Sequence, residues 1–240
     1  MRSYIRIVPI AALLLLPVSS ARAQTAADPS GHWQGKIETP GMDLNIEVDL
    51  AKNGAGALIG TVAIPAEHVK GLPLAKLVVE GRTVTFGARE DQTLTGDLSD
   101  DGKTMSGTFS VAGATVPFLL TREGDAKIDP PARSAAIGKD LEGTWTTTVE
   151  STGNRVALKL TNHPDGTATG SLINLSEGGL EIPMRITQTG SSVTLETTVV
   201  AGTFSGTLNA AATELAGTWS EGPVSKPVTF HRAGAAESKK

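Results

Sequence analysis

Oxygen-bearing side chains at Asp97, Ser99 and Asp101, followed by Gly102, have the spacing that begins a calcium-binding loop. The twelfth position of such a loop requires a bidentate glutamate, but Thr108 stands there. A turn residue cluster between two strand-like runs is instead typical of a hairpin. We therefore predict a turn here and not a metal site.

The four histidines could in principle ligate a metal or act as bases. His32, His68, His163 and His231 lie far apart in the sequence, without the i, i+4 spacing or cysteine partner of a metal site. The sequence therefore predicts no metal and no cofactor.

Motifs for nucleophilic or nucleotide chemistry also fail on spacing. The segment Gly202-Thr203-Phe204-Ser205-Gly206 does not have the Gly-x-Ser-x-Gly order of a nucleophile elbow. Gly54-Ala55-Gly56 leads into strand-like residues, whereas a phosphate-binding loop must open a helix. The acid pair Asp100-Asp101 has no apolar pocket that would raise a pKa. We expect a protein that is not an enzyme.

The first 23 residues have the three parts of a secretory signal. Two arginines precede an apolar stretch at 7–18, and Ala21-Arg22-Ala23 forms a small-residue cleavage site. The apolar stretch is interrupted by prolines and is shorter than the roughly 20 residues of a membrane-spanning helix. We expect a signal peptide at 1–23, a short lead at 24–30, and a periplasmic or secreted protein that does not span the membrane.

Composition excludes several further classes. The 240-residue chain has no cysteine and a formal net charge of −4. Removal of the leader takes away three arginines and makes the chain more acidic. An acidic chain without a long basic run has no electrostatic footprint for nucleic acid. Its fold must depend on the apolar core, since no disulfide is available.

The chain contains an internal repeat. Gly31-His32-Trp33 aligns with Gly143-Thr144-Trp145, an offset that drifts little along the chain. Further aligned pairs are Leu72-Pro73-Leu74 with Ile182-Pro183-Met184, Leu94 to Leu98 with Phe204 to Leu208, Met105 to Phe109 with Leu215 to Trp219, and Pro117 to Arg122 with Pro227 to Arg232. Such an ordered series indicates a duplication.

Each copy is predicted to be a meander of short strands. Leu44, Ile46, Val48 and Leu50 alternate with polar residues, as in a strand with one buried face. Turn residues separate such runs, which predicts about eight strands per copy. The predicted units are a first barrel at 31–122, a linker at 123–139, a second barrel at 140–232 and a disordered tail at 233–240. We expect an all-β fold of two tandem antiparallel meander β-barrels, with two-sheet β-sandwiches as the alternative.

Gly-x-Trp on the first strand is matched by an arginine that ends the last strand, as Trp33 with Arg122 and Trp145 with Arg232. This pairing resembles the calycin superfamily, the lipocalins and their relatives, in which the guanidinium packs over the indole and closes the barrel floor. The first copy also resembles the small lipocalin-like domain in front of secreted bacterial α/β-hydrolases. We expect no hydrolase half here, since a second copy follows the first. The Ser-Pro-x-Gln-like segment of those domains is not kept at 64–70.

A ligand, if held inside the barrels, would meet inward-facing aromatic and glycine positions. The candidate ligand-binding residues are Trp33, Phe86, Gly107, Phe109, Trp145, Gly217, Trp219 and Phe230. Trp33 and Trp145 could equally be core-closing aromatics covered by arginine. Inward glycines either let coiled strands bend or leave room for a guest. We expect Gly107 and Gly217, beside Gly96 and Gly206, to leave a small cavity in at least one copy.

Two functions remain open from the sequence. The first is an exported binding module that takes up small apolar molecules or lipid fragments inside the barrels. The second is a structural or interaction protein with filled barrels, which holds an extracytoplasmic protein partner through its outer faces or the groove between the copies.

Overall fold

The computed structural model describes residues 27–130, 132–149, 152–176, 178–197 and 199–234. The predicted signal peptide, the first residues of the lead and the tail from residue 235 lie outside the described residues. The described chain is built almost entirely of strands, with one short 3-10 helix, η1 (Pro65–Glu67). The all-β prediction is confirmed.

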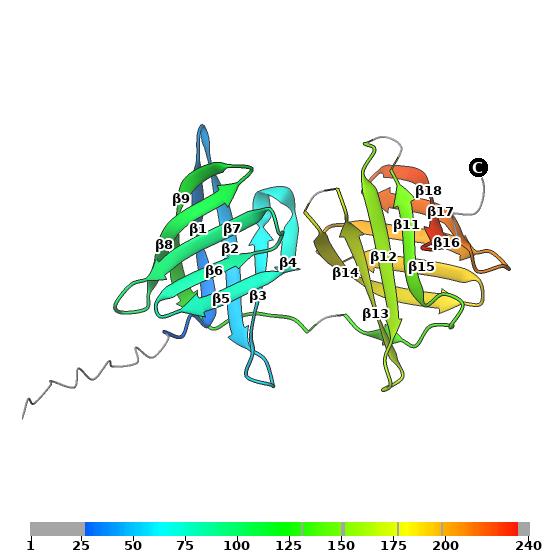
Figure 1. Ribbon diagram of the computed structural model, residues 1–240, viewed down its shortest axis with the longest axis horizontal. Coiled ribbons are helices and arrows are strands. Elements are labelled where there is room, and N and C mark those ends of the chain that lie inside the picture. Colours follow the sequence, from blue (N-terminus) through cyan, green and yellow to red (C-terminus); the bar gives the residue numbers. More distant parts are fainter. Residues whose placement is uncertain (1–26, 131, 150–151, 177, 198, 235–240) are drawn as a thin grey trace, which may run out of the picture.

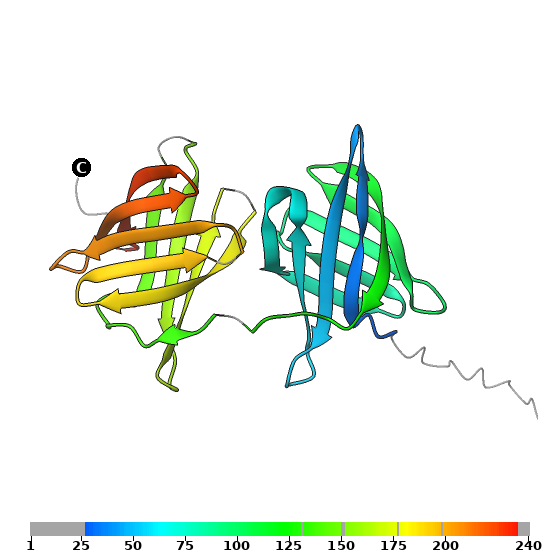
Figure 2. The same cartoon turned by 180° about the vertical axis from the view of Figure 1, so that it is seen from behind.

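The strands fall into two groups that follow the sequence repeat. The first group comprises β1 (Gly31–Thr39), β2 (Met42–Lys52), β3 (Leu58–Ile64), β4 (Val69–Pro73), β5 (Lys76–Glu80), β6 (Thr83–Gly87), β7 (Gln92–Leu98), β8 (Thr104–Val111) and β9 (Ala114–Gly124). The second comprises β10 (Ser134–Ala135), β11 (Gly143–Thr148), β12 (Arg155–Asn162), β13 (Thr167–Asn174), β14 (Leu180–Thr189), β15 (Ser192–Thr197), β16 (Gly202–Leu208), β17 (Glu214–Glu221) and β18 (Val224–Arg232). Figure 1 shows the two groups side by side, and Figure 2 shows the segment between β9 and β10 running along one edge of both.

The second repeat is a closed antiparallel barrel. Among the described residues, β11 to β18 pair in the order β13-β12-β11-β18-β17-β16-β15-β14, and a further pairing of β13 with β14 closes the ring. β10 pairs with the first two residues of β13 through Ser134 and Ala135. Part of the predicted linker therefore belongs to the second repeat.

The first repeat is a curled sheet with the same strand order but an interruption in its wall. β14 of the second repeat pairs with β13 through its first half and with β15 through its second half. The aligned segment of the first repeat is split into β4, which pairs with β3, and β5, which pairs with β6. The amides of Leu74 and Ala75 still donate to Gly60 and Gly87, at 2.9 Å each, so the two halves stay attached to the sheet. The described sheet nevertheless ends at β4 and β5 and has no ladder between them.

Alternation of apolar and polar residues places one face of each strand inside, as predicted. In β2, Ile46, Val48 and Leu50 are at most 2% exposed, while the residues between them are only partly buried. Burial of such side chains contributes about 1.5 to 3 kcal/mol each, and this term must carry the fold of a chain without disulfides.

The two repeats also pack against each other. Ile182 and Val199 of the second repeat belong to the buried cluster of the first. The Lys70 amide donates to the Val199 carbonyl at 2.9 Å, and the Glu90 amide donates to the Gly178 carbonyl at 3.2 Å. The core of the first repeat is therefore completed by residues from the second.

This packing predicts unequal stability for the separated halves. The fragment 127–240 keeps a closed barrel and its own core, so we expect it to unfold cooperatively. The fragment 24–126 loses the contacts of Ile182 and Val199, so we expect it to melt at a lower temperature than the second half. Thermal melts of both fragments followed by circular dichroism test this order, and a more stable first half would contradict it.

Candidate functional site

An arginine covers an indole ring in each repeat, as the resemblance to the calycins implied. The Cζ atom of Arg122 lies 4.6 Å from the Trp33 ring centroid, and that of Arg232 lies 4.2 Å from the Trp145 ring centroid. Both tryptophans are fully buried. The first and last strands pair at this point, since Trp33 lies opposite Arg122 and Trp145 opposite Arg232.

The same arginines bind the chain segment that precedes the first strand. Arg122 donates through Nη1 to the Ser30 carbonyl at 2.7 Å and through Nη2 to the Asp28 carbonyl at 2.9 Å. Arg232 donates to the Glu142 carbonyl at 2.8 Å and to the Asp140 carbonyl. The acceptors thus occupy aligned positions in the two repeats.

The indole nitrogens complete this arrangement, which the sequence analysis did not foresee. Trp33 Nε1 donates to the Pro29 carbonyl and Trp145 Nε1 to the Leu141 carbonyl, each at 2.9 Å. The segments Asp28-Pro29-Ser30 and Asp140-Leu141-Glu142 align at the same offset as the tryptophans, so the repeat itself carried the signal. A hydrogen bond from Lys52 Nζ, with others from Ser30, holds the pKa of Asp28 well below its usual range.

The glycine of Gly-x-Trp leaves room for the guanidinium. A Cβ atom on Gly143 would lie 2.9 Å from Arg232 Nη1, and this glycine has a φ of +128°. Larger residues rarely adopt that conformation. The Gly-x-Trp signature is therefore explained by closure of the barrel floor.

Most of the predicted ligand-binding aromatics are part of the packed interior. Trp33, Phe86, Trp145 and Phe230 are at most 2% exposed. Phe86 meets Phe118 edge-on with ring centroids 6.2 Å apart. Phe109 and Trp219 are partly buried and pack against the two cores.

The paired glycines prove to be close approaches of backbone and not vacancies. Gly96 lies opposite Gly107, and Gly206 opposite Gly217, as predicted. A Cβ atom on Gly107 would lie 2.0 Å from the Thr95 carbonyl oxygen and 2.5 Å from Gly96 Cα. On Gly217 it would lie 2.2 Å from the Ser205 carbonyl oxygen. The expected cavity at these glycines is therefore wrong, because neighbouring backbone fills the space where their side chains would lie.

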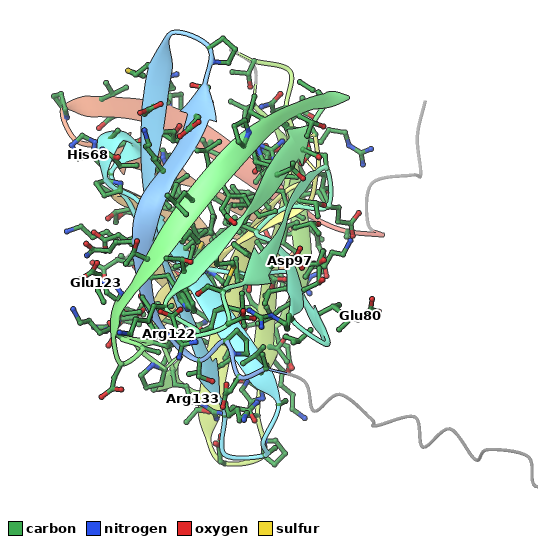
Figure 3. The ribbon with its side chains drawn as sticks, turned by 90° about the vertical axis from the view of Figure 1, so that its left-hand side faces the viewer. His68, Glu80, Asp97, Arg122, Glu123 and Arg133 are labelled. Atoms are coloured by element: carbon green, nitrogen blue, oxygen red, sulfur yellow. The ribbon has the colours of Figure 1, made fainter. Side chains whose placement is uncertain are left out.

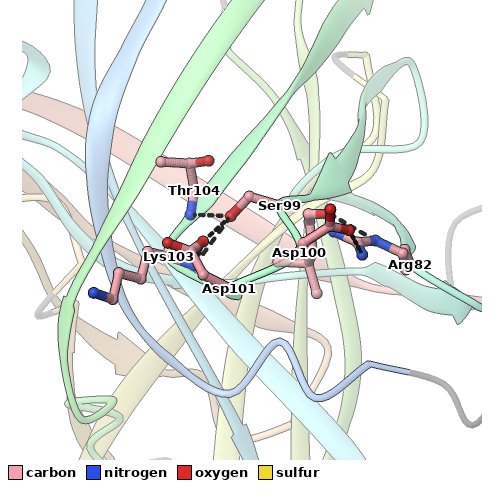
Figure 4. A network of polar contacts seen from close by, with 7 residues as sticks. Arg82, Ser99, Asp100, Asp101, Lys103 and Thr104 are labelled. Carbon is pink, nitrogen blue, oxygen red and sulfur yellow. Dashed lines mark hydrogen bonds and ion pairs between the residues drawn. The ribbon is translucent and has the colours of Figure 1, made fainter.

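A small polar cavity of about 340 Å³ lies beside the floor of the first repeat. Figure 4 shows its polar network, in which Arg82 pairs with Asp100 and the Ser99 hydroxyl accepts the Thr104 amide at 2.9 Å. Hydrogen bonds from the Ser99 hydroxyl and the Lys103 amide lower the pKa of Asp101. The bonds of Ser99 and Asp101 are internal to the β7–β8 turn, which confirms the predicted hairpin, whereas Asp100 pairs with Arg82 of the neighbouring β5–β6 turn.

A larger groove of about 1140 Å³ lies over the outer face of the first repeat. We call it the inter-repeat groove, because its lining comes from β1 to β4, the start of β5, the linker residues 127–130 and 132, and Pro183 and Val199 of the second repeat. None of the eight predicted ligand-binding residues lines this groove or the smaller cavity. The groove includes Leu74, Ala75 and Leu77, so it reaches the interruption between β4 and β5.

A polar row forms part of the groove floor. Strand pairing puts His32 opposite Asp49, and Asp49 opposite Thr61. His32 Nδ1 lies 2.9 Å from Asp49 Oδ1, and His32 Nε2 lies 3.0 Å from the amide nitrogen of Gln34. A carboxylate can only accept, so His32 Nδ1 donates to Asp49, while Nε2 faces the side-chain amide of Gln34.

The same carboxylate holds the linker on the first repeat. The Lys127 amide donates to Asp49 Oδ1 at 2.8 Å. His32 is 5% exposed, so its imidazole is buried beneath the groove. His68 also lines the groove, at the opposite end of the repeat from Arg122 in Figure 3. The sequence did not reveal that these two distant histidines share one groove, since their proximity depends on strand order.

Two further observations limit the chemistry of the described residues. No cluster of three or more histidine, cysteine, aspartate or glutamate side chains among them could hold a metal ion. No helix among them is long and apolar enough to cross a membrane.

Comparison with known proteins identifies no family. No protein-family model matches the chain, and no curated protein matches it. A solved structure of unknown function from the DUF3598 family of Nostoc punctiforme is similar over 85% of this chain and 96% of that chain, with 15% identity and a TM-score of 0.27. A "putative outer membrane protein" of Bacteroides fragilis is similar over 84% and 95%, with 14% identity and a TM-score of 0.26. Both TM-scores are low, so we base no functional inference on either structure.

The two closing arginines are expected to differ in their contribution to stability. Arg232 Nε donates to the Ala212 carbonyl at 2.7 Å, whereas Arg122 Nε is buried without a hydrogen-bond partner in the described residues. Arg122→Ala should lower the free energy of unfolding by about 1 to 2 kcal/mol through lost stacking and packing. Arg232→Ala should cost about 0.5 to 1.5 kcal/mol more, since it also loses a neutral-acceptor hydrogen bond. Urea denaturation of both variants measures this difference, and a costlier Arg122→Ala would contradict it.

Alanine substitution tests the close approach at the paired glycines. Gly107→Ala should destabilise the protein by about 1 to 3 kcal/mol, because the added methyl meets backbone. Gly54→Ala is the matched control, since nothing lies within 4 Å of the Cβ position there. Thermal denaturation compares the two, and an unchanged melting temperature for Gly107→Ala would restore the cavity interpretation.

Proposed function

We propose that this protein is an exported, non-enzymatic binding module that holds a small, largely apolar molecule in the inter-repeat groove. The observation that carries the proposal is the groove itself, about 1140 Å³ in volume and lined by apolar side chains together with polar and charged ones. Ligand sites in proteins typically have volumes of roughly 300 to 1,000 Å³, mostly apolar walls and a small number of placed polar groups. They also occur preferentially where two structural units meet.

The state of the barrel interiors favours the outer groove over an internal site. Large side chains such as Trp33, Phe86, Trp145 and Phe204 are fully buried in the two cores. The inward glycines supply no spare volume, since neighbouring backbone and side chains lie close to where their Cβ atoms would be. We therefore propose that the ligand binds in the inter-repeat groove and not inside the barrels.

We also propose that the two repeats are related to the calycins and that the protein is exported. Arginine stacked on a buried indole in both repeats supports the resemblance to the calycins. The signal-like residues 1–23 support export to the periplasm or beyond the cell.

A second candidate is an interaction protein that holds a protein partner on its outer surface. It is favoured by exposed apolar side chains, of which Ile59 lies in the groove and is 39% exposed. A protein partner would need more surface than one small-molecule site, so the two candidates differ in whether a small probe binds saturably.

Blocking the groove tests the proposal. Thr61 faces outward on β3 and lines the groove, so Thr61→Trp should fill part of it. We expect the neutral fluorescent probe N-phenyl-1-naphthylamine to bind the wild type saturably and to bind Thr61→Trp at least about tenfold more weakly, a loss of ~1.4 kcal/mol. Fluorescence titration of the full chain measures both.

Thr85→Trp is the matched control. Thr85 lies on β6, is partly buried like Thr61, and lines neither cavity. Its replacement should leave probe binding unchanged. Absence of saturable binding to the wild type, or equal loss in both variants, would overturn the proposal and favour the interaction protein.

A further inference from the structure

We propose that the ligand of the inter-repeat groove carries a cationic nitrogen, and that Glu47 and Asp49 on the groove floor bind it. This inference rests on the proposed function, because it specifies the chemistry of a ligand at that same site. The ligand class is an amphiphilic amine with an apolar body and an ammonium end.

Glu47 is a carboxylate without a partner in the described residues. It lies on β2, faces outward between the buried Ile46 and Val48, and lines the groove. Its side chain makes no hydrogen bond or ion pair with any residue that the structure describes, although it is partly buried. A partly buried carboxylate without a partner loses hydration without compensation. A ligand N–H donor would restore that interaction.

Asp49 uses only one of its two oxygens. Both the His32 ring nitrogen and the Lys127 amide donate to Oδ1, at 2.9 and 2.8 Å. Oδ2 has no partner in the described part of the chain, and the side chain is 13% exposed. A carboxylate has about four acceptor sites on its two oxygens, so Asp49 retains capacity facing the groove.

The two carboxylates are placed to act on one charge. Glu47 and Asp49 are two residues apart on the same strand, so they lie on one face, roughly 7 Å apart along it. Their neighbours on β1 are Gln34 and His32, which bond each other, and His32 also bonds Asp49 Oδ1. The floor at this point therefore presents two carboxylates with no lysine or arginine of the described residues within 4 Å.

Two exposed lysines also line the groove. Lys70 and Lys127 are exposed, and neither ammonium group pairs with a carboxylate of the described residues within 4 Å. Exposed lysines are well hydrated and gain little from an anionic ligand. The partly buried carboxylates on the floor gain more, so the charge balance favours an ammonium over a carboxylate ligand.

The second repeat lacks this feature at the aligned positions. Ala157 stands where the first repeat has Glu47, and Lys159 where it has Asp49. Neither residue lines the groove. The proposed recognition therefore belongs to the first repeat alone.

Competition between two amphiphiles of equal length tests the inference on the full chain. Octylammonium and octanoate are each titrated against bound N-phenyl-1-naphthylamine at low ionic strength, where charges are least screened. We expect octylammonium to displace the probe at an about tenfold lower concentration than octanoate, a difference of ~1.4 kcal/mol. In Glu47→Gln the two should come within about twofold of each other, while affinity for the neutral probe stays the same.

Glu80→Gln is the control for loss of one negative charge. Glu80 is exposed at the end of β5, lines neither cavity, and lies across the first repeat from His68 in Figure 3. The Glu80→Gln variant should keep the wild-type preference for octylammonium over octanoate. Equal displacement of the probe by both amphiphiles, or a preference for octylammonium that persists in Glu47→Gln, would contradict an ammonium ligand. In either case, saturable probe binding would still support the groove as a ligand site. Absence of probe binding would instead remove the proposed function and this inference together.

Discussion

Each repeat depends on one guanidinium group that lies between an indole face and the carbonyls of the preceding chain segment. The indole fills the floor of the barrel, but its edge nitrogen needs an acceptor once it is buried. The lead provides that acceptor, and the arginine of the last strand binds the lead through two neighbouring carbonyls. First strand, last strand and lead are thus fixed by the same few atoms. The strand order that forms the groove follows from this closure, because β1 must lie between β2 and β9.

The sequence predicted those parts of the fold that depend on local pattern or on the repeat. Strand alternation and the hairpin at Asp97 to Gly102 required only spacing and residue type. The packing of each Arg over its Trp was implied by the resemblance to the calycins. The interruption at Leu74 and Ala75 was not predictable in this way, because the aligned residues of the second repeat form one continuous strand. Whether a strand continues there depends on packing with distant segments, which a single sequence does not specify.

For the candidate site too, local features were predictable from the sequence and the arrangement in space was not. Gly107 and Gly217 do lie at inward-facing positions of their strands, as predicted. The alternation of a strand could not show whether such a position leaves empty space or a close approach of backbone. A difference of about 1 to 2 Å decides between them, and it arises from the coiling of neighbouring strands. The groove was similarly hidden, since it joins residues near position 32 with the linker and with Val199. Only the folded arrangement brings these segments together.

Comparison of the two repeats separates what the fold requires from what it merely permits. Inner positions keep their character, as with Trp33 and Trp145 or Gly60 and Gly170, because a densely packed interior tolerates little change in volume. On the outer face, Thr144 stands in the second repeat where the first has His32. The second barrel closes without a histidine there, so closure does not need the buried His32 and its carboxylate partner.

A buried polar side chain is costly unless it is fully hydrogen-bonded, and even then it contributes little net stability. The first repeat nevertheless buries His32 and surrounds it with Asp49 and Gln34 on the face that becomes the groove floor. Departures from the simplest packing tend to occur where a protein binds or reacts, since stability alone would not retain them. His32 fixes the orientation of Asp49, and Asp49 in turn holds the linker that forms one side of the groove. The polar row therefore shapes the groove and orients one of its two carboxylates, a role that has no counterpart in the second repeat.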